Sequence, residues 1–391
     1  MTQAVRHDSM RARNLEVVLG EVGRHGPMTR AALAESTGLT KSTVSKLVAD
    51  LLQAGILAES GVIRAGERGR PGVEVSLSGH RVAALGLEVN VDYLAVCLLD
   101  LARSVRLSIR VERDNRGSSP DEVLAELRVL ALDAIEEAGR MGLTVAGAML
   151  AVSGPVDHGV IYNAPNLGWR DVRAAESLQL PLDVDMDNEA NLAALGELWF
   201  GTGDPDFLYV SGEIGIGAGL VVDGGLFRGV HGFAGELGHV VISAAGQPCR
   251  CGGRGCLEGY AGQEALLRAA AVTGGMTELV ARLRDGDKRA AKACADAGRA
   301  LGIALTSAVN LLDLDRIVLG GIFARLFPWL SGSVGAALES RLGTLRRTVP
   351  SLAASRLGGD AATLGAAGQV VQRIIAEPGA YVAQAREAYS S

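Results

Sequence analysis

Several features are scarce in this sequence, and each scarcity excludes a class of protein. Five of the 391 residues are cysteine and 4% are aromatic, and this cysteine content is too low for a small disulfide-stabilised fold. Charges or glycines interrupt the apolar runs before about 18 residues, so no transmembrane helix is expected. The N-terminal segment MTQAVRHDSMRARN is polar and lacks an apolar signal region. We therefore expect a cytoplasmic protein that does not bind membranes.

The residues that are plentiful indicate a globular protein with more than one domain. Hydrophobic residues make up 48% and charged residues 21%, a balance that buries sizeable cores and excludes intrinsic disorder. A length of 391 residues suits two or three domains. Charge is unevenly divided, because residues 1–80 contain ten Lys or Arg and eight Asp or Glu, whereas the remainder contains 28 and 36. The first eighty residues therefore form a distinct region.

This N-terminal region has the pattern of a helix-turn-helix. Apolar spacing predicts a helix over 14–24. Thr29 is expected to cap a second, short helix that stops at Gly38, and a third helix opens at Thr40 or Lys41 and runs to about Ala54. A short helix, a turn with glycine and a longer helix form the motif that places a recognition helix in the major groove.

The third helix and the segment after it present polar and basic residues for DNA. The apolar stripe of this helix faces inward, so its N-terminal turn offers hydroxyls and lysines to phosphates and base edges. Two strands around a basic turn over 57–77 predict a wing. The expected DNA-binding residues are Thr40, Lys41, Ser42, Thr43, Ser45, Lys46, Arg68 and Arg70. The alternative is a helical bundle and hairpin that only pack on the next domain.

After residue 80 the chain alternates strands and helices, which predicts an α/β fold. Strands are expected over 82–87, 94–99, 105–111 and 145–152, with a helix over 119–138. The same order returns in strands over 208–210, 217–222 and 317–319 and a helix over 290–312. We therefore expect a winged helix-turn-helix domain over 1–80, a first α/β lobe over 81–195 and a second over 196–391, with a cleft between the lobes.

The strongest chemical signal is a cluster of metal ligands. His239, Cys249, Cys251 and Cys256 lie within 18 positions, among glycines that let the backbone fold around a centre. One imidazole and three thiolates suit tetrahedral zinc. Four protein ligands leave no position for water, which favours a structural zinc ion in the loop 239–256 over a catalytic one.

Two further stretches carry weaker signals. The polar segment 185–191 precedes a predicted helix over 192–197, and its carboxylates and carboxamides suit either hydrogen bonds to vicinal hydroxyls or simple helix capping. The glycine-rich turn 211–219 lies between strands. It suits phosphate binding or tight packing equally well.

Taken together, these motifs resemble the ROK family of repressors, open reading frames and kinases, specifically its repressor branch, over nearly the whole chain. The resemblance implies a two-lobed, actin-like ATPase fold with sugar in the cleft, zinc near it and a C-terminal helix that returns to the first lobe. The metal ligands match the family's zinc signature. The residues that match its sugar-contacting motifs are Asn188, Glu189, Glu236, His239 and Glu258.

Departures from the kinase pattern imply that phosphoryl transfer is lost. Where the family's kinases have Asp-x-Gly-Gly-Thr, this chain has Glu88-Val89-Asn90-Val91-Asp92, and a Gly-Thr-Gly pattern appears as Glu213-Ile214-Gly215. Asp92 and Glu213 are expected to repel a triphosphate. Glu189 replaces the catalytic Asp, and its extra methylene displaces the carboxylate from the aligned position. We therefore expect no enzyme activity.

The sequence thus predicts a sugar-responsive transcriptional regulator, a repressor of carbohydrate-metabolism genes. Its expected partners are an inverted-repeat, double-stranded DNA operator, a sugar effector and further copies of itself in a homodimer or homotetramer, with structural zinc as cofactor. Two alternatives stay open. One is an active ATP-dependent sugar kinase with an appended DNA-binding domain, and the other is a zinc sensor in which the sugar residues are vestigial.

Overall fold

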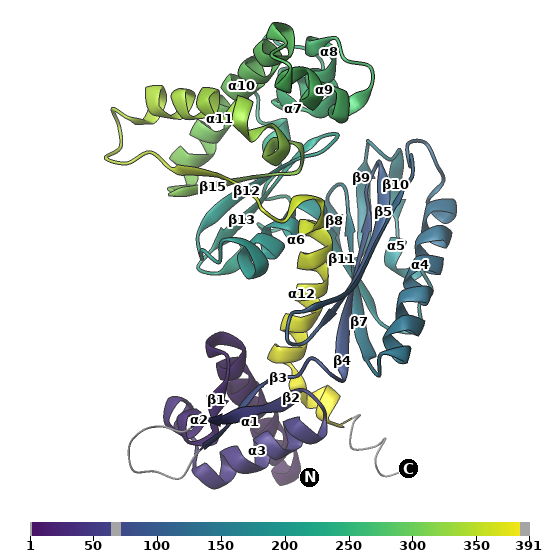
Figure 1. Cartoon of the computed structure of the whole chain (residues 1–391), viewed down its shortest axis with the longest axis vertical. Coiled ribbons are helices and arrows are strands. Elements are labelled where there is room, and N and C mark those ends of the chain that lie inside the picture. Colours follow the sequence, from purple (N-terminus) through teal and green to yellow (C-terminus); the bar gives the residue numbers. More distant parts are fainter. Residues whose placement is uncertain (1, 64–71, 384–391) are drawn as a thin grey trace.

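The computed structural model describes residues 2–63 and 72–383, and its N-terminal part is a winged helix-turn-helix domain (Figure 1). Its helices are α1 (Thr2–His25), α2 (Arg30–Thr37) and α3 (Lys41–Gln53). Its antiparallel sheet has the order β1-β3-β2, with β1 (Met28–Thr29), β2 (Leu57–Ile63) and β3 (Gly72–Leu77). The predicted helix-turn-helix and wing strands are confirmed. Arg68 and Arg70 lie between β2 and β3, outside the described residues.

Local capping explains why the recognition helix begins where it does. The Thr40 hydroxyl accepts a hydrogen bond from the Thr43 backbone N–H at 3.2 Å, and Thr29 caps α2 in the same way through Ala32. Gly38 ends α2 with a φ of 70°, a left-handed conformation that favours glycine. The first helix was predicted to begin at residue 14 but begins at Thr2, because 2–13 contains no glycine or proline to stop it.

The first α/β lobe is built on a five-stranded sheet with the order β11-β7-β4-β5-β6. Its strands are β4 (Val82–Val89), β5 (Tyr93–Asp100), β6 (Val105–Glu112), β7 (Thr144–Val152) and β11 (Val184–Asn188). In Figure 1 helix α4 (Pro120–Arg140) lies on one face of this sheet and α12 (Ala361–Ala376) on the other. The two helices pack on different side chains of β4, as the alternation along a strand requires.

The second lobe repeats this topology. Its sheet has the order β14-β13-β12-β15-β16, with β12 (Phe207–Gly212), β13 (Ile216–Val222), β14 (Gly225–Phe227), β15 (Arg316–Gly320) and β16 (Ser351–Ala354). Numbered along the chain within each lobe, both sheets read 3-2-1-4-5. Helices α10 (Lys288–Leu312) and α11 (Gly321–Leu342) pack on this lobe. The duplicated α/β fold that the sequence predicts is therefore present.

Shorter helices and strands connect the main elements of the lobes, and several of them were not predicted. A small sheet of β8 (Val156–Asp157), β9 (Val160–Ala164) and β10 (Trp169–Val172) follows β7. The further helices are α5 (Ala174–Ser177), α6 (Glu189–Gly196), α7 (Glu258–Ala261), α8 (Gln263–Ala270) and α9 (Gly275–Arg284), with a π-helix at Glu197–Gly201 and 3₁₀ turns at Leu237–His239 and Gly358–Asp360. Helix α6 begins three residues earlier than predicted, because Asn188 caps it.

Helix α12 joins the DNA-binding domain to the first lobe. One hydrophobic core cluster contains Leu19 of α1, Leu192 of α6 and Ile375 of α12, and Figure 1 shows α12 running from the lobes down to the N-terminal domain. The packing of α6 on α12 is close, because a Cβ at Gly365 would lie 1.7 Å from the Leu192 carbonyl oxygen. Only glycine fits there.

Among the described helices, none has the length and apolar character needed to cross a bilayer.

Candidate functional site

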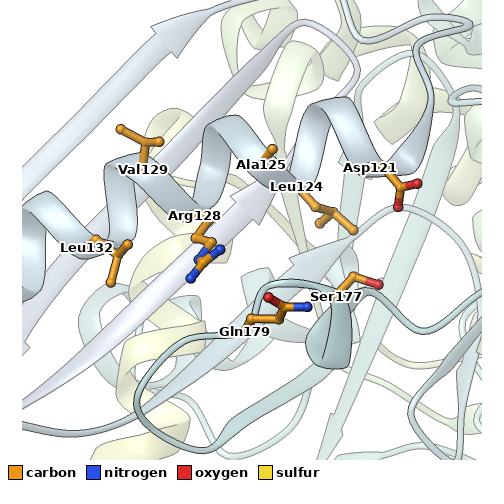
Figure 2. Close-up of a pocket in the computed structure, with 8 residues that line it drawn as sticks. All are labelled: Asp121, Leu124, Ala125, Arg128, Val129, Leu132, Ser177 and Gln179. Atoms are coloured by element: carbon orange, nitrogen blue, oxygen red, sulfur yellow. The ribbon is translucent and has the colours of Figure 1, made fainter.

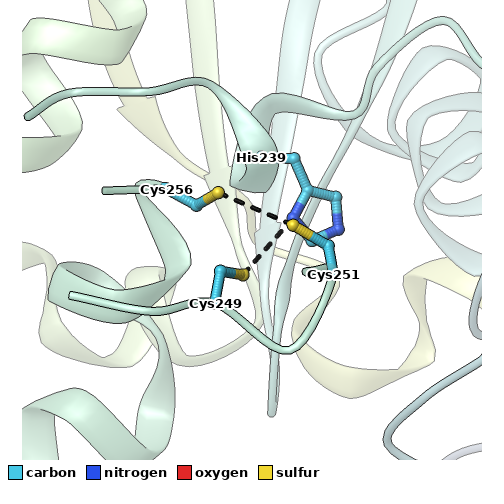
Figure 3. Close-up of side chains that lie close together, drawn as sticks. All are labelled: His239, Cys249, Cys251 and Cys256. Carbon is cyan, nitrogen blue, oxygen red and sulfur yellow. Dashed lines mark hydrogen bonds between the residues drawn. The ribbon is translucent and has the colours of Figure 1, made fainter. Parts of the chain in front are cut away.

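Four side chains of the second lobe converge to form a candidate metal site (Figure 3). The ligand atoms of His239, Cys249, Cys251 and Cys256 all lie within 4.8 Å of one another. The His239 Nδ1 atom lies 3.9 Å from Cys249 Sγ, and Cys251 Sγ lies 3.7 Å from Cys256 Sγ. These spacings are those of ligands arranged around a single tetrahedral zinc ion.

The backbone around this site is folded so that ligands from separate turns meet. His239 ends a 3₁₀ turn, and Cys256 pairs with Val241 in an isolated β-bridge. Gly255 has a φ of 72°, and a Cβ there would lie 1.7 Å from the Ser243 carbonyl oxygen, so this position requires glycine. The loop has few buried apolar side chains of its own, and a metal ion would hold it together.

The protonation of the thiols differs because their surroundings differ. The Gly253 backbone N–H holds the pKa of Cys251 below its ordinary value, whereas burial raises the pKa of Cys256 to about 12. A bound dication stabilises all three thiolates directly. The donor set fits zinc, whose softness suits thiolate and imidazole ligands.

The two ring nitrogens of His239 face different groups, one the metal ligands and the other a carboxylate. While Nδ1 faces Cys249, Nε2 lies 3.8 Å from a carboxylate oxygen of Glu236. Burial is the main cause that raises the pKa of Glu236; His239 lowers it and Glu258 raises it further. The backbone N–H of Ile216 donates to Glu258 at 3.2 Å. Glu236, His239 and Glu258 therefore form one polar group beside the metal site.

The other two predicted sugar residues lie in the first lobe, at the start of α6. Asn188 caps this helix and donates from Nδ2 to the Gly154 carbonyl oxygen at 2.9 Å. The Ser153 hydroxyl donates to Glu189 at 2.9 Å, and burial raises the pKa of Glu189. The structure thus places the five predicted sugar residues in two groups, one in each lobe.

An ion pair links the two lobes, and the sequence analysis did not predict it. Arg228, which follows β14, donates to Asp187 from Nη2 at 2.6 Å and from Nε at 3.0 Å. Asp187 also accepts from Asn191 at 3.0 Å. The two partners are 41 positions apart, so no local pattern predicts the contact. Because Asp187 precedes Asn188, this pair holds the loop before Glu236 against the start of α6.

Carboxyl groups surround a small cavity at the place where the family resemblance puts the nucleotide phosphates. Glu88, Glu189 and Glu213 line a cavity of about 20 Å³, roughly the space for one water molecule. Tyr93 donates its hydroxyl to Glu88 at 2.7 Å, and the second oxygen of Glu88 has no hydrogen-bond partner among the described residues. A triphosphate needs far more room than this cavity offers.

The carboxyl groups near this cavity differ in burial and in their partners. Burial and then the neighbouring Glu189 raise the pKa of Glu88 to about 8, and the same two causes raise that of Glu213 well above its ordinary value. Glu88 therefore favours the neutral form at neutral pH. Asp92 is partly exposed and pairs with Arg116 at 2.6 Å. The small cavity adds a steric reason for excluding a triphosphate to the repulsion expected from Asp92 and Glu213, which stays a prediction.

The candidate DNA surface is the outer face of α3. Val44, Leu47, Val48 and Leu51 are buried, which leaves Lys41, Ser42, Ser45 and Lys46 exposed and Thr43 half-buried. Thr40 is exposed, and its hydroxyl is engaged in the helix cap. The charged and hydroxylated side chains of the first two turns therefore face solvent together, as a recognition helix requires.

A groove of about 400 Å³ lies elsewhere on the first lobe, between α4 and the segment after α5 (Figure 2). Leu124, Val129 and Leu132 supply its apolar lining, and Arg128 and Gln179 its polar groups. No residue of the predicted sugar or metal sets lines it. The groove is therefore separate from the candidate site.

Both the N-terminal domain and the two lobes are similar to known protein families. Residues 84–373 match the model of the ROK family and residues 17–63 that of the MarR family. The xylose repressor of Bacillus subtilis (strain 168) is 30% identical over 370 residues, which are 93% of this chain and 96% of the repressor. A glucokinase of Halalkalibacterium halodurans is 40% identical over 191 residues, 42% of this chain and 57% of the kinase.

The overall fold also matches a solved structure. The crystal structure of a ROK family transcriptional regulator, a homolog of the E. coli MLC protein, superimposes with a TM-score of 0.81 and 24% identity. It covers 97% of this chain and 99% of that regulator, so the match includes the winged helix domain as well as both lobes. With a family model matched over most of its length, this chain belongs to the ROK family.

Proposed function

We propose that this chain is a sugar-responsive, DNA-binding transcriptional regulator that represses genes of carbohydrate metabolism. The observation that carries the proposal is an exposed recognition helix joined to a ROK domain with little room for nucleotide phosphates. Glu88, Glu189 and Glu213 leave about 20 Å³ beside the expected phosphate position, which is too small for a triphosphate. The relative matched over 93% of this chain is a repressor, whereas the glucokinase matches 42%.

The first turns of α3 would contact double-stranded DNA in the major groove. Lys41 and Lys46 supply positive charge, the helix N-terminus adds its dipole, and the hydroxyls of Ser42, Thr43 and Ser45 meet phosphates or base edges. Thr40 fixes the start of the helix, and Arg68 and Arg70 extend the contact from the wing. Two copies related by a two-fold axis would reach half-sites ~34 Å apart, which implies an inverted-repeat operator and a homodimer or homotetramer.

The sugar would bind between the lobes. Asn188 and Glu189 face it from the first lobe, and Glu236, His239 Nε2 and Glu258 from the second. Carboxylates accept and amide or imidazole N–H groups donate, which suits vicinal hydroxyls. Because the contacts come from both lobes, the sugar favours one lobe arrangement over another. A difference of about 1 to 3 kcal/mol between the two states changes DNA affinity about 5- to 150-fold.

Zinc has a structural role in this proposal. Bound by His239, Cys249, Cys251 and Cys256, it would fix the loop that carries two of the sugar contacts. The chain would act in the cytoplasm, with its DNA-binding domain over 1–80 and its lobes over 81–195 and 196–391.

Selection of genomic fragments tests DNA binding directly. The full-length, zinc-loaded chain is mixed with sheared genomic DNA of its source organism, and the recovered sequences are compared. We expect one inverted repeat, bound more weakly by Lys46→Ala, with a salt slope about 0.9 smaller for one lost phosphate contact. Lys292→Ala, an exposed lysine of the second lobe, is the matched control and should bind as the wild type does. Recovery of no common sequence would refute the proposal.

An ATP-dependent sugar kinase with an appended DNA-binding domain is the second candidate, favoured by the partial match to a glucokinase. Incubation of the same protein with Mg-ATP and a sugar panel should yield no sugar phosphate. Turnover that is lost in Glu189→Gln would establish the kinase instead.

A further inference from the structure

A second cavity adjoins the proposed sugar site at the boundary of the lobes. It measures about 140 Å³ and is lined by Asn166 of the first lobe and by Arg250, Glu258 and Glu264 of the second. Glu258 belongs to the proposed sugar set, and the other four residues of that set do not line this cavity. The cavity is therefore next to the first site and shares one carboxylate with it.

The size of the cavity restricts what it can hold. This is close to the ~150 Å³ of an engineered protein cavity that binds one benzene ring. This volume is of the order of one sugar ring, and it is well below the ~300–1,000 Å³ of a pocket for a drug-sized ligand. A single ring fits such a space.

The lining has the chemistry of a carbohydrate subsite. Its polar groups are planar amides, guanidinium groups and carboxylates, which together offer both donors and acceptors, as hydroxyl groups require. Ile214 and Ala265 add buried apolar surface, 7% and 8% exposed, for the C–H face of a ring. Two arginines, Arg250 and Arg268, are matched by the carboxylates of Glu258 and Glu264. With the lining residue Cys249 assigned to the metal, the remaining charges balance, which favours an uncharged polyhydroxylated ligand over a phosphate.

Arg250 is held in position from both lobes. Its Nη2 atom donates to the two carboxylate oxygens of Glu264 at 3.0 and 2.9 Å, and Nη1 donates to Asn166 Oδ1 at 3.2 Å. The Arg250 and Glu264 side chains are 55% and 51% exposed, so their polar atoms remain open to a ligand. Arg250 also stands between the metal ligands Cys249 and Cys251, so a ligand in this cavity would contact the zinc loop directly.

We infer that this cavity is a second sugar subsite, so that the effector is a glycoside of at least two rings. The inference rests on the proposed sugar-binding function. The first ring lies against Asn188, Glu189, Glu236, His239 and Glu258. The second passes Glu258 and lies against Arg250 and Asn166, and it adds contacts that favour the closed lobes.

Calorimetric titration of the full-length, zinc-loaded protein tests the inference. The probes are glucose and xylose, and the disaccharides maltose, cellobiose and xylobiose. We expect one disaccharide to bind at least about tenfold tighter than its component monosaccharide, and Arg250→Ala to remove that advantage, as the loss of hydrogen bonds from a charged group predicts. Monosaccharide affinity should change less than about twofold in this variant.

Two further variants separate the subsite from indirect effects. Asn166→Ala changes a residue outside the zinc loop, removes the contact that the first lobe makes to Arg250, and should reproduce the loss; zinc content is measured in every variant. Arg173→Ala, which breaks an exposed pair with Glu176, is the control and should bind as the wild type does. Monosaccharide binding with no gain from any disaccharide, or an equal loss for both in Arg250→Ala, would overturn the subsite alone. No binding of any sugar would overturn the proposed function with it.

Discussion

The buried carboxyl group of Glu88 makes a strong prediction about pH. Its side chain is 2% exposed, and burial raises its pKa from 4.5 to about 8. In the folded protein this group therefore keeps its proton over a pH range in which the unfolded chain has lost it. The folded state binds more protons between pH 4.5 and about 8, so stability falls as the pH rises through that window.

The magnitude follows from the same two values. Each pKa unit corresponds to about 1.36 kcal/mol, so ionisation of Glu88 costs the folded state about 5 kcal/mol above pH 8. Glu88→Gln keeps the shape and an oxygen that can accept from Tyr93, but it cannot ionise. We therefore expect the variant to match the wild type near pH 5 and to be more stable at pH 9.

Urea unfolding at pH 5, 7 and 9, followed by far-ultraviolet circular dichroism on zinc-loaded protein, measures this effect. The difference between the unfolding midpoints of Glu88→Gln and wild type should grow steadily with pH. A residual slope should remain in the variant, because Glu189 and Glu213 also have raised pKa values. Glu136→Gln, an exposed position on α4, is the control. If Glu88→Gln keeps the full pH slope of the wild type, Glu88 is not buried as described.

Three shorter predictions follow from other contacts. Cys251→Ser should bind zinc more weakly and reduce the sugar response, measured by metal analysis and by the sugar-dependent change in DNA affinity; a normal response would separate metal from effector. Arg228→Ala breaks the pair with Asp187 and should weaken sugar binding severalfold without unfolding the lobes, and unchanged affinity would remove the pair from the site. Gly365→Ala forces a Cβ against the Leu192 carbonyl oxygen and should lower the melting temperature by several degrees, whereas a stable variant would mean that α6 and α12 are not so close.

Much of the architecture could be predicted because its causes are local. The start of α3 is set by Thr40 two residues after a glycine turn, and the metal cluster is set by four ligands of strict type within one loop. The strands of both lobes are apolar runs bounded by turns. In each case the determining residues lie within a few positions of one another.

The contacts that the sequence did not predict are those between distant segments. The Arg228–Asp187 pair joins positions 41 apart, and the raised pKa of Glu88 depends on burial that only the assembled lobes create. Helix α11 was also missed, since it contains Pro328 and its first residue is a glycine with a φ of 54°, both of which interrupt a helical pattern. The helices, strands and metal cluster could thus be predicted from neighbouring residues. The ion pair and the raised pKa at the boundary of the lobes could not, because they arise from tertiary packing.

In the proposed function, the cleft of this protein binds a sugar and excludes ATP. Thermal unfolding of the full-length, zinc-loaded chain against a panel of mono- and disaccharides and Mg-ATP tests both halves at once, because a ligand of the native state raises the melting temperature by mass action. We expect a rise with one sugar and none with Mg-ATP. A clear rise with Mg-ATP would contradict it.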